Sequence, residues 1–225
     1  GLTRIVDKRF VRRDHADFFC TLTEGIKGKR AVDWKLIDEL VPRSALLDKA
    51  MERAKQFAEN SDRPAKATGI ELTPLSRTIS ETTITYDTVT IQIDPTDRVA
   101  RINVAAPTEM PPSDLGEIHA QGAKFWPLAM ARDLDDAILH LRTNLPELGT
   151  WVFTTSGDAD LVDAADKALL DNTGDWFVRE TTLFLKRVFK RIDVTSRSII
   201  TLVEPGSCFA GSLMELVLAA DRSFM

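Results

Sequence analysis

Residues 198–225, SIITLVEPGSCFAGSLMELVLAADRSFM, decide the fold. The apolar, β-branched segment 199–203 predicts a strand, and Pro205-Gly206 predicts the turn that ends it. An apolar run with helical spacing follows from about residue 210. A strand that leads through a turn into a helix is the repeating unit of α/β proteins, so this stretch predicts that class.

The start of this predicted helix carries three small residues, Ala210, Gly211 and Ser212. A helix start leaves backbone N–H groups without partners inside the helix, and such donors can hold a developing oxyanion. Glu215 is the carboxylate within the apolar run and lies about one turn further on. The pattern therefore indicates a candidate site in which backbone donors and one carboxylate act together.

Composition sets limits on the class of protein. The chain has 225 residues, a net charge of −5 and a sequence pI of about 5.3, which give no electrostatic reason to expect a nucleic acid partner. No apolar run approaches the roughly 20 residues of a membrane span, and no signal peptide is recognisable. We therefore expect a cytoplasmic protein without a membrane partner.

The two cysteines, Cys20 and Cys208, are far apart and suggest no disulfide framework. The three histidines show no ligand spacing with cysteines or acidic residues, so we expect no metal site. Cys208 follows the predicted turn, but no histidine partner is identifiable. We interpret it as a small buried apolar residue rather than a nucleophile.

The first 60 residues are expected to be mostly helical. Apolar spacing predicts helices over 17–21, 30–40 and 44–59, the last capped by Ser44. Residues 61–81 lack a clear period and contain two prolines, so we expect a linker. This divides the chain into a helical part over 1–60 and a second part over 82–225.

The second part alternates strand and helix patterns. Segments 82–93 and 99–105 predict a hairpin, since both alternate and the turn Asp94-Pro95 falls between them. An amphipathic helix over 126–143 follows, and the remaining strand and helix patterns are expected over 150–155, 163–170, 179–189 and 199–203. The order predicts α/β layers with a largely parallel core sheet.

Two motifs in this part resemble the crotonase (enoyl-CoA hydratase/isomerase) superfamily. Segment 155–166, TSGDADLVDAAD, aligns without a gap with the family segment that ends in Ala-Gly-x-Asp. The resemblance implies that the N–H of Ala165 is the first oxyanion donor, with Ala159 as the alternative because Ala164 replaces the family glycine. Segment 99–107 resembles the family's second strand and the loop after it, which helps form the coenzyme A pocket.

The second motif, 210–216 (AGSLMEL), resembles the family signature Gly-Gly-Gly-x-Glu-Leu. Counting back from the glutamate assigns the second oxyanion N–H to Ser212, and counting forward from the turn assigns it to Gly211. Both remain candidates. Glu215 matches the signature glutamate, which implies a role in acid/base catalysis or in orienting water. From the residues alone, Glu215 is equally well explained as a helix-surface carboxylate or as the partner of Arg222.

The first 60 residues resemble the other end of a crotonase module. Residues 1–4 are similar to a Gly-Gly-Thr-x-Arg segment, and 30–41 to a helix and strand in which Trp34 and Lys35 replace small residues. The fold implied is a crotonase-like spiral of ββα repeats, in which the helical C-terminal part of one module joins the N-terminal half of a second. This tandem arrangement, with the motif EPGSCFAG at 204–211, resembles the benzoyl-CoA-dihydrodiol lyase family.

This resemblance implies a lyase that opens the ring of epoxidised (dihydrodiol) benzoyl-CoA with water and releases formate in aerobic aromatic degradation. The partner would be an acyl-CoA substrate, with coenzyme A as part of the thioester and no separate cofactor, and the enzyme would be a homo-oligomer. A second acidic catalytic residue would lie beyond Met225, so we expect an internal segment that is catalytically incomplete alone. The alternatives are a generic enoyl-CoA hydratase/isomerase and a non-catalytic crotonase-like assembly module.

Overall fold

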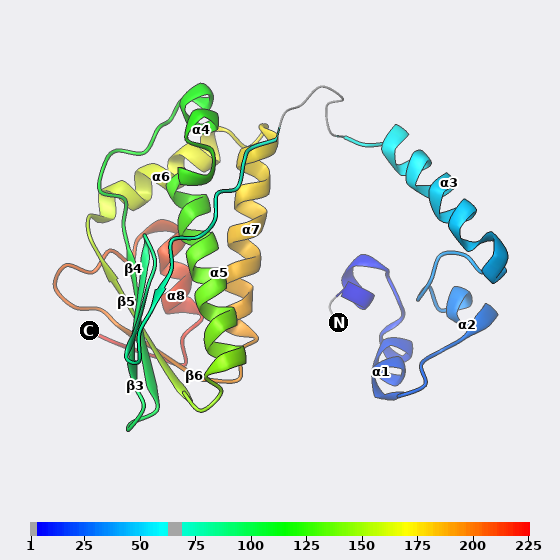
Figure 1. Ribbon diagram of the computed structural model, residues 1–225, viewed down its shortest axis with the longest axis horizontal. Coiled ribbons are helices and arrows are strands. Elements are labelled where there is room, and N and C mark those ends of the chain that lie inside the picture. Colours follow the sequence, from blue (N-terminus) through cyan, green and yellow to red (C-terminus); the bar gives the residue numbers. More distant parts are fainter. Residues whose placement is uncertain (1–3, 63–68) are drawn as a thin grey trace. The chain divides into compact units, whose positions relative to one another are not determined.

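The computed structural model describes residues 4–62 and 69–225, and the chain forms two compact units (Figure 1). The units are Gly1–Lys66 and Ala67–Met225, so their boundary falls within the range 61–81 expected as a linker. Residues 1–3, which carry most of the Gly-Gly-Thr-x-Arg resemblance, lie outside the described residues. Within the described ranges, no helix is long and apolar enough to cross a membrane.

The first unit is helical, as its apolar spacing predicts. A π-helical turn opens it, and short helices connected by loops follow. Within residues 4–62 the buried apolar residues are few, namely Val11, Ala16 and Ala31, so the apolar core of the described part of this unit is small. The elements are η1 (Arg4–Lys8), α1 (Arg13–Thr21), α2 (Gly28–Asp33), η2 (Arg43–Ala45) and α3 (Leu46–Glu59).

Three predictions for this unit are wrong in detail. The helix expected over 30–40 ends at Asp33, because Lys35 adopts the left-handed conformation (φ 61°) and turns the chain. No strand follows it in the described part of this unit. Ser44 does not cap α3 but lies inside the turn η2, and Ala45 is the residue before the helix.

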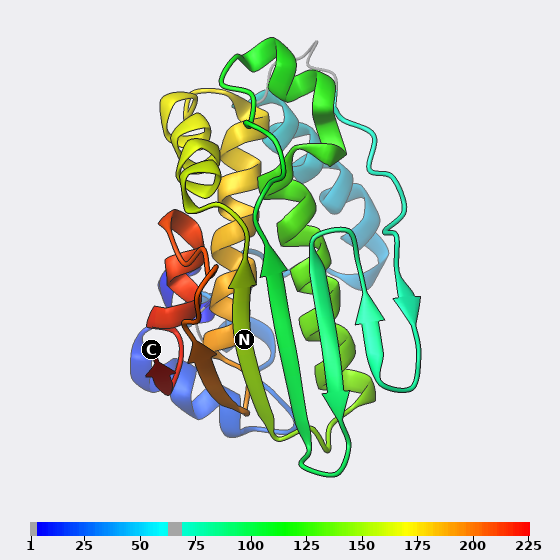
Figure 2. The same ribbon diagram turned by 90° about the vertical axis from the view of Figure 1, so that its left-hand side faces the viewer.

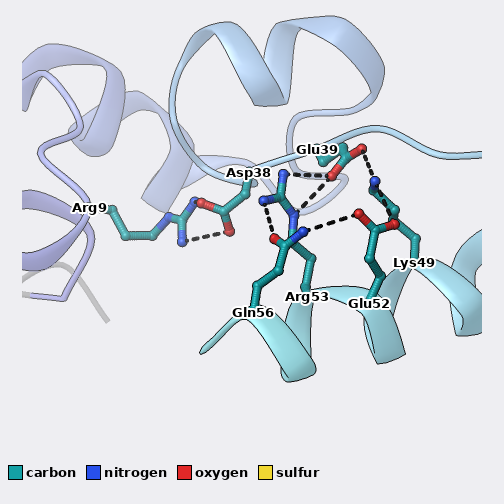
Figure 3. Close-up of polar contacts among 7 residues, drawn as sticks. All are labelled: Arg9, Asp38, Glu39, Lys49, Glu52, Arg53 and Gln56. Carbon is teal, nitrogen blue, oxygen red and sulfur yellow. Dashed lines mark hydrogen bonds and ion pairs between the residues drawn. The ribbon is translucent and has the colours of Figure 1, made fainter. Parts of the chain in front are cut away.

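Polar contacts tie α3 to the segment before it (Figure 3). The Glu39 carboxylate accepts hydrogen bonds from the Arg53 guanidinium at 3.0 and 3.2 Å and lies 3.6 Å from the Lys49 ammonium. The apolar side chains of α3 are uncovered within this structure, with Leu47 and Phe57 about three-quarters exposed. Polar contacts rather than apolar burial therefore position this helix.

The second unit is built on one seven-stranded sheet whose strands follow one another in sequence order, β1 to β7. The pairs from β1 to β4 are antiparallel, and those from β4 to β7 are parallel. This confirms an α/β class with a parallel centre. The strands are β1 (Thr78–Ile79), β2 (Thr83–Thr85), β3 (Val89–Asp94), β4 (Val99–Ala105), β5 (Thr150–Ser156), β6 (Ser198–Leu202) and β7 (Arg222–Phe224).

Helices α5 and α7 cover one face of this sheet (Figures 1 and 2). The core lies between them and the strands, where Ile102, Phe153 and Leu134 are fully buried. Successive side chains of a strand point to opposite faces of the sheet, so only one face of β4 is buried. On that face Ala100, Ile102 and Val104 are buried, whereas Arg101 on the other face is exposed. The helices are α4 (Leu115–Gln121), η3 (Gly122–Lys124), α5 (Trp126–Asn144), α6 (Ala159–Asp171), α7 (Trp176–Asp193), η4 (Gly211–Leu213) and α8 (Met214–Leu218).

A buried carboxylate holds the strand hairpin against α5. Asp133 is 4% exposed, and its Oδ2 accepts hydrogen bonds from the backbone N–H of Thr88 at 3.0 Å and from its hydroxyl at 2.8 Å. Burial raises the pKa of Asp133, and the Thr88 donors act in the opposite direction. The contact fixes the turn before β3 relative to the helix that covers the sheet.

Candidate functional site

The candidate site lies at the carboxyl ends of the parallel strands, the edge at which open α/β sheets bind ligands. There the end of β5 is joined to both neighbouring connections. The carbonyl of Ser156 accepts a hydrogen bond from the N–H of Ala106 at 2.9 Å, and the N–H of Gly157 donates to the carbonyl of Gly206 at 3.3 Å. Three loops, which follow β4, β5 and β6, are thus fixed against one another.

Gly157 shows why the β5 loop needs a glycine. Its φ is +121°, and a Cβ at this position would lie 2.7 Å from the Cβ of Ala106. The chain therefore leaves β5 in close contact with the β4 loop before α6 begins. Asp158 caps that helix, and its carboxylate accepts from the N–H of Asp160 at 2.9 Å.

Ala165 lies in the middle of α6 and is fully buried. An amide at this depth in an α-helix bonds the carbonyl four residues before it, so the N–H of Ala165 is occupied by the helix itself. The amides at the start of α6 are the ones that the helix leaves without intrahelical partners. Ala159, the alternative donor, is the first residue of α6.

The predicted second motif lies against α6, and α6 contacts η4. The backbone N–H of Ser212 donates to Oδ2 of Asp166. The amide of Gly211 has no acceptor within the part of the chain that the structure describes. Of the two candidate donors in this motif, Ser212 is therefore already bound by a carboxylate of the protein, whereas Gly211 is available to a ligand.

Gly211 is required by its surroundings. Its φ is +46°, and a Cβ there would overlap the Asp166 carboxylate and lie 3.2 Å from Oδ1 of Asp163. Burial raises the pKa of Asp166, and the nearby Asp163 charge adds to this, whereas the Ser212 amide lowers it. From the sequence, Asp166 is equally consistent with a solvated helix residue, and no local signal marks its contact with a residue 46 positions later.

Glu215 is the second residue of α8 and is exposed. Its possible partner Arg222 donates instead to the carbonyl of Asp221, at 3.1 Å. The structure thus places Glu215 on the same short helical segment as Gly211, with its carboxylate accessible to water.

The other residues of the motif are structural. Cys208 is fully buried, and its N–H donates to the hydroxyl of Thr155 at 2.8 Å, which fixes the turn to β5. Glu204 begins that turn, because its N–H donates to the Ser207 hydroxyl and its carbonyl accepts the N–H of Ser207. These contacts confirm the interpretation of Cys208 as a buried apolar residue and place Glu204 in the turn.

Comparison with known proteins finds sequence similarity to an enzyme. The chain is 52% identical to benzoyl-CoA-dihydrodiol lyase of Aromatoleum evansii. The similarity extends over all 225 residues and spans 40% of that lyase's length. No protein-family model matches the chain.

Proposed function

We propose that this chain forms part of a lyase that opens the ring of epoxidised (dihydrodiol) benzoyl-CoA with water and releases formate. The observation that carries the proposal is 52% identity over the whole chain to benzoyl-CoA-dihydrodiol lyase. At this identity, the loops at the carboxyl ends of β4, β5 and β6 are expected to keep the same backbone course as in that enzyme.

For the fold we propose the crotonase-like spiral. The hairpin of β3 and β4, followed by helices and parallel strands, supports assigning residues 82–225 to the N-terminal half of one module. The helical character of the first unit supports assigning residues 1–60 to the C-terminal part of another. The exposed apolar side chains of α3 support a homo-oligomer, since large apolar patches mark interaction surfaces.

For the chemistry we propose that backbone amides bind the thioester oxygen. Negative charge develops on that oxygen in the transition state, and loss of one such donor in other enzymes costs about 100-fold or more in rate. Gly211 is the proposed donor on η4, because its amide has no acceptor within the described residues. The first turn of α6, at Ala159, is the proposed second donor, in place of Ala165.

Glu215 is the proposed acid/base or water-orienting residue. Its exposure supports the second role in particular, because a carboxylate in contact with water can hold a water molecule next to the acyl group. Ring opening by water needs no redox cofactor, so we propose none beyond the coenzyme A of the substrate. A cytoplasmic location is part of the same proposal, since acyl-CoA thioesters are its substrate class.

The test is Glu215→Gln in the full-length enzyme, with turnover of dihydrodiol benzoyl-CoA measured by release of formate. We expect kcat to fall about 100-fold, the size of effect typical for loss of a positioned acid/base group. Glu59→Gln, which neutralises an exposed glutamate at the end of α3, is the matched control and is expected to leave kcat unchanged. Unchanged turnover in Glu215→Gln would exclude a catalytic role for Glu215.

A second candidate function is a non-catalytic assembly module, which the position of Ala165 in the middle of α6 favours. It predicts that Glu215→Gln leaves turnover unchanged. A generic enoyl-CoA hydratase/isomerase is the nearby alternative. It predicts that the same enzyme turns over a linear enoyl-CoA faster than the epoxidised benzoyl-CoA.

A further inference from the structure

A cavity of about 550 Å³ in the first unit is lined by four cationic side chains: Arg4, Lys8, Arg9 and Lys35. The first three come from η1 and the residue after it, and Lys35 comes from the loop after α2. Small-molecule sites have volumes of roughly 300–1,000 Å³, so this cavity is of a suitable size. The whole chain has a net charge of −5, so a cluster of four cations is opposite in sign to the net charge of the protein.

The cavity has an excess of positive charge. Asp38 is the acidic residue among its described lining residues, and Arg9 already binds it (Figure 3). The two guanidinium nitrogens of Arg9 lie 3.0 and 3.3 Å from the two carboxylate oxygens. Within residues 4–62, no carboxylate lies at ion-pair distance from Arg4, Lys8 or Lys35. These three cations are thus uncompensated at one surface.

Arg9 also shapes the wall of the cavity. Its Nε donates to the carbonyl of Lys35 at 2.8 Å, which links η1 to the loop after α2. With the two bonds to Asp38, the guanidinium is fixed at three points. The cavity is therefore held open by a residue whose geometry is set before any ligand binds.

Lys35 provides an independent observation. Its φ of 61° is the left-handed conformation, which glycine adopts readily and other residues adopt at a cost in conformational free energy. The loop holds it there, since the N–H of Lys35 donates to the carbonyl of Val32 at 2.8 Å. Strained non-glycine residues are enriched at binding sites, where the side chain is needed despite the strain. Here the side chain is a cation on the cavity.

We propose that this cavity binds the diphosphate group of an organic anion. Arg4, Lys8 and Lys35 would pair with phosphate oxygens, because lysine and arginine bind phosphate through charge-assisted hydrogen bonds. Three uncompensated cations match a group with more than one negative charge better than a single carboxylate. Ile5 and Ile37 line the same cavity and offer apolar contact to the organic part of the ligand. The proposal does not depend on the lyase activity.

The test is calorimetric titration of the full chain with inorganic diphosphate at low ionic strength. Lys35→Gly removes the cation and relieves the left-handed strain, so the variant is expected to fold with an unchanged or higher Tm. We expect Lys35→Gly and Lys8→Gln each to weaken binding about tenfold, the effect of losing one charge-assisted hydrogen bond. Lys29→Gln removes the same charge from α2 outside the cavity and is expected to change the Kd by less than about twofold.

Absence of saturable binding, or equal weakening by all three variants, would overturn the proposal. Once saturable binding of inorganic diphosphate is measured, ADP and coenzyme A, which both contain a diphosphate, are tested as competitors of this probe. Displacement by either one that is weakened in Lys35→Gly supports the site, and the better competitor identifies the source of the diphosphate. Displacement by neither contradicts an organic diphosphate ligand.

Discussion

Replacement of Gly211 by alanine tests the contact between η4 and α6 most directly. The added Cβ would overlap the Asp166 carboxylate, and the backbone would have to keep its φ of +46°. If the carboxylate moves away, it loses the N–H of Ser212. We therefore expect Gly211→Ala to destabilise the second unit through two separable effects.

We expect Gly211→Ala to lower the free energy of unfolding by about 3 kcal/mol, the sum of two contributions. A non-glycine residue in the left-handed region costs about 1 kcal/mol. Loss of a hydrogen bond to a charged group adds about 1.5–3 kcal/mol. In an Asp166→Ala background the carboxylate is absent, so Gly211→Ala should cost only the first contribution, and the two changes should be coupled by about 2 kcal/mol.

The assay is urea unfolding of all four proteins of this cycle, followed by tryptophan fluorescence. Trp126, Trp151 and Trp176 lie in the second unit and report on its unfolding. Gly206→Ala is the control, because Gly206 has a φ of +88° but a Cβ added there would meet no atom within 4 Å, and it should cost about 1 kcal/mol. If Gly211→Ala costs the same with and without the Asp166 carboxylate, the reasoning is refuted.

Two further predictions concern buried carboxylates. Burial raises the pKa of Asp166 in the folded state. The protonated carboxyl therefore favours the folded state at low pH, and this contribution to the free energy of unfolding is lost as pH rises from the unfolded pKa of about 4 through the folded pKa. Asp166→Asn should therefore gain stability relative to the unchanged protein over this range, as urea unfolding at several pH values will show, and a constant difference would contradict this. Asp133→Ala should cost about 2–3 kcal/mol, because the N–H and hydroxyl of Thr88 lose their acceptor in a buried setting. A cost below about 0.5 kcal/mol in the same assay would argue against a role for this contact.

Much of the second unit could be predicted from its local sequence. The single strand expected over 82–93 is wrong, because the chain turns at 86–88 and β2 pairs antiparallel with β3. The helix expected over 126–143 is observed as Trp126–Asn144, and the hairpin around the turn at 94–95 is observed as β3 and β4. Both are long patterns that bury one face, so the apolar period carries the information. The helix α4 is missing from the sequence-based prediction, although Asp114 caps it and Glu117 follows three residues later, because nearby prolines indicate only a loop.

The candidate site could be predicted only at the level of segments. The sequence indicates that the segments around α6 and η4 carry the chemistry, and the structure brings α6 and η4 into contact. The sequence pattern does not indicate which amides at the helix start lack intrahelical partners, because α6 begins at Ala159, four residues before the helix expected from 163. The Asp166–Ser212 bond depends on tertiary packing between segments far apart in the chain, which no local period encodes.

The order of the strands has a consequence for synthesis on the ribosome. Since each strand from β2 onward pairs with the strand made immediately before it, a nascent chain that emerges N-terminus first can add strands at a growing edge. No strand pair already formed has to open to admit a later one. The loops that carry the candidate site follow β5 and β6, so they would be assembled late, on a scaffold whose hairpin and first parallel pair already exist.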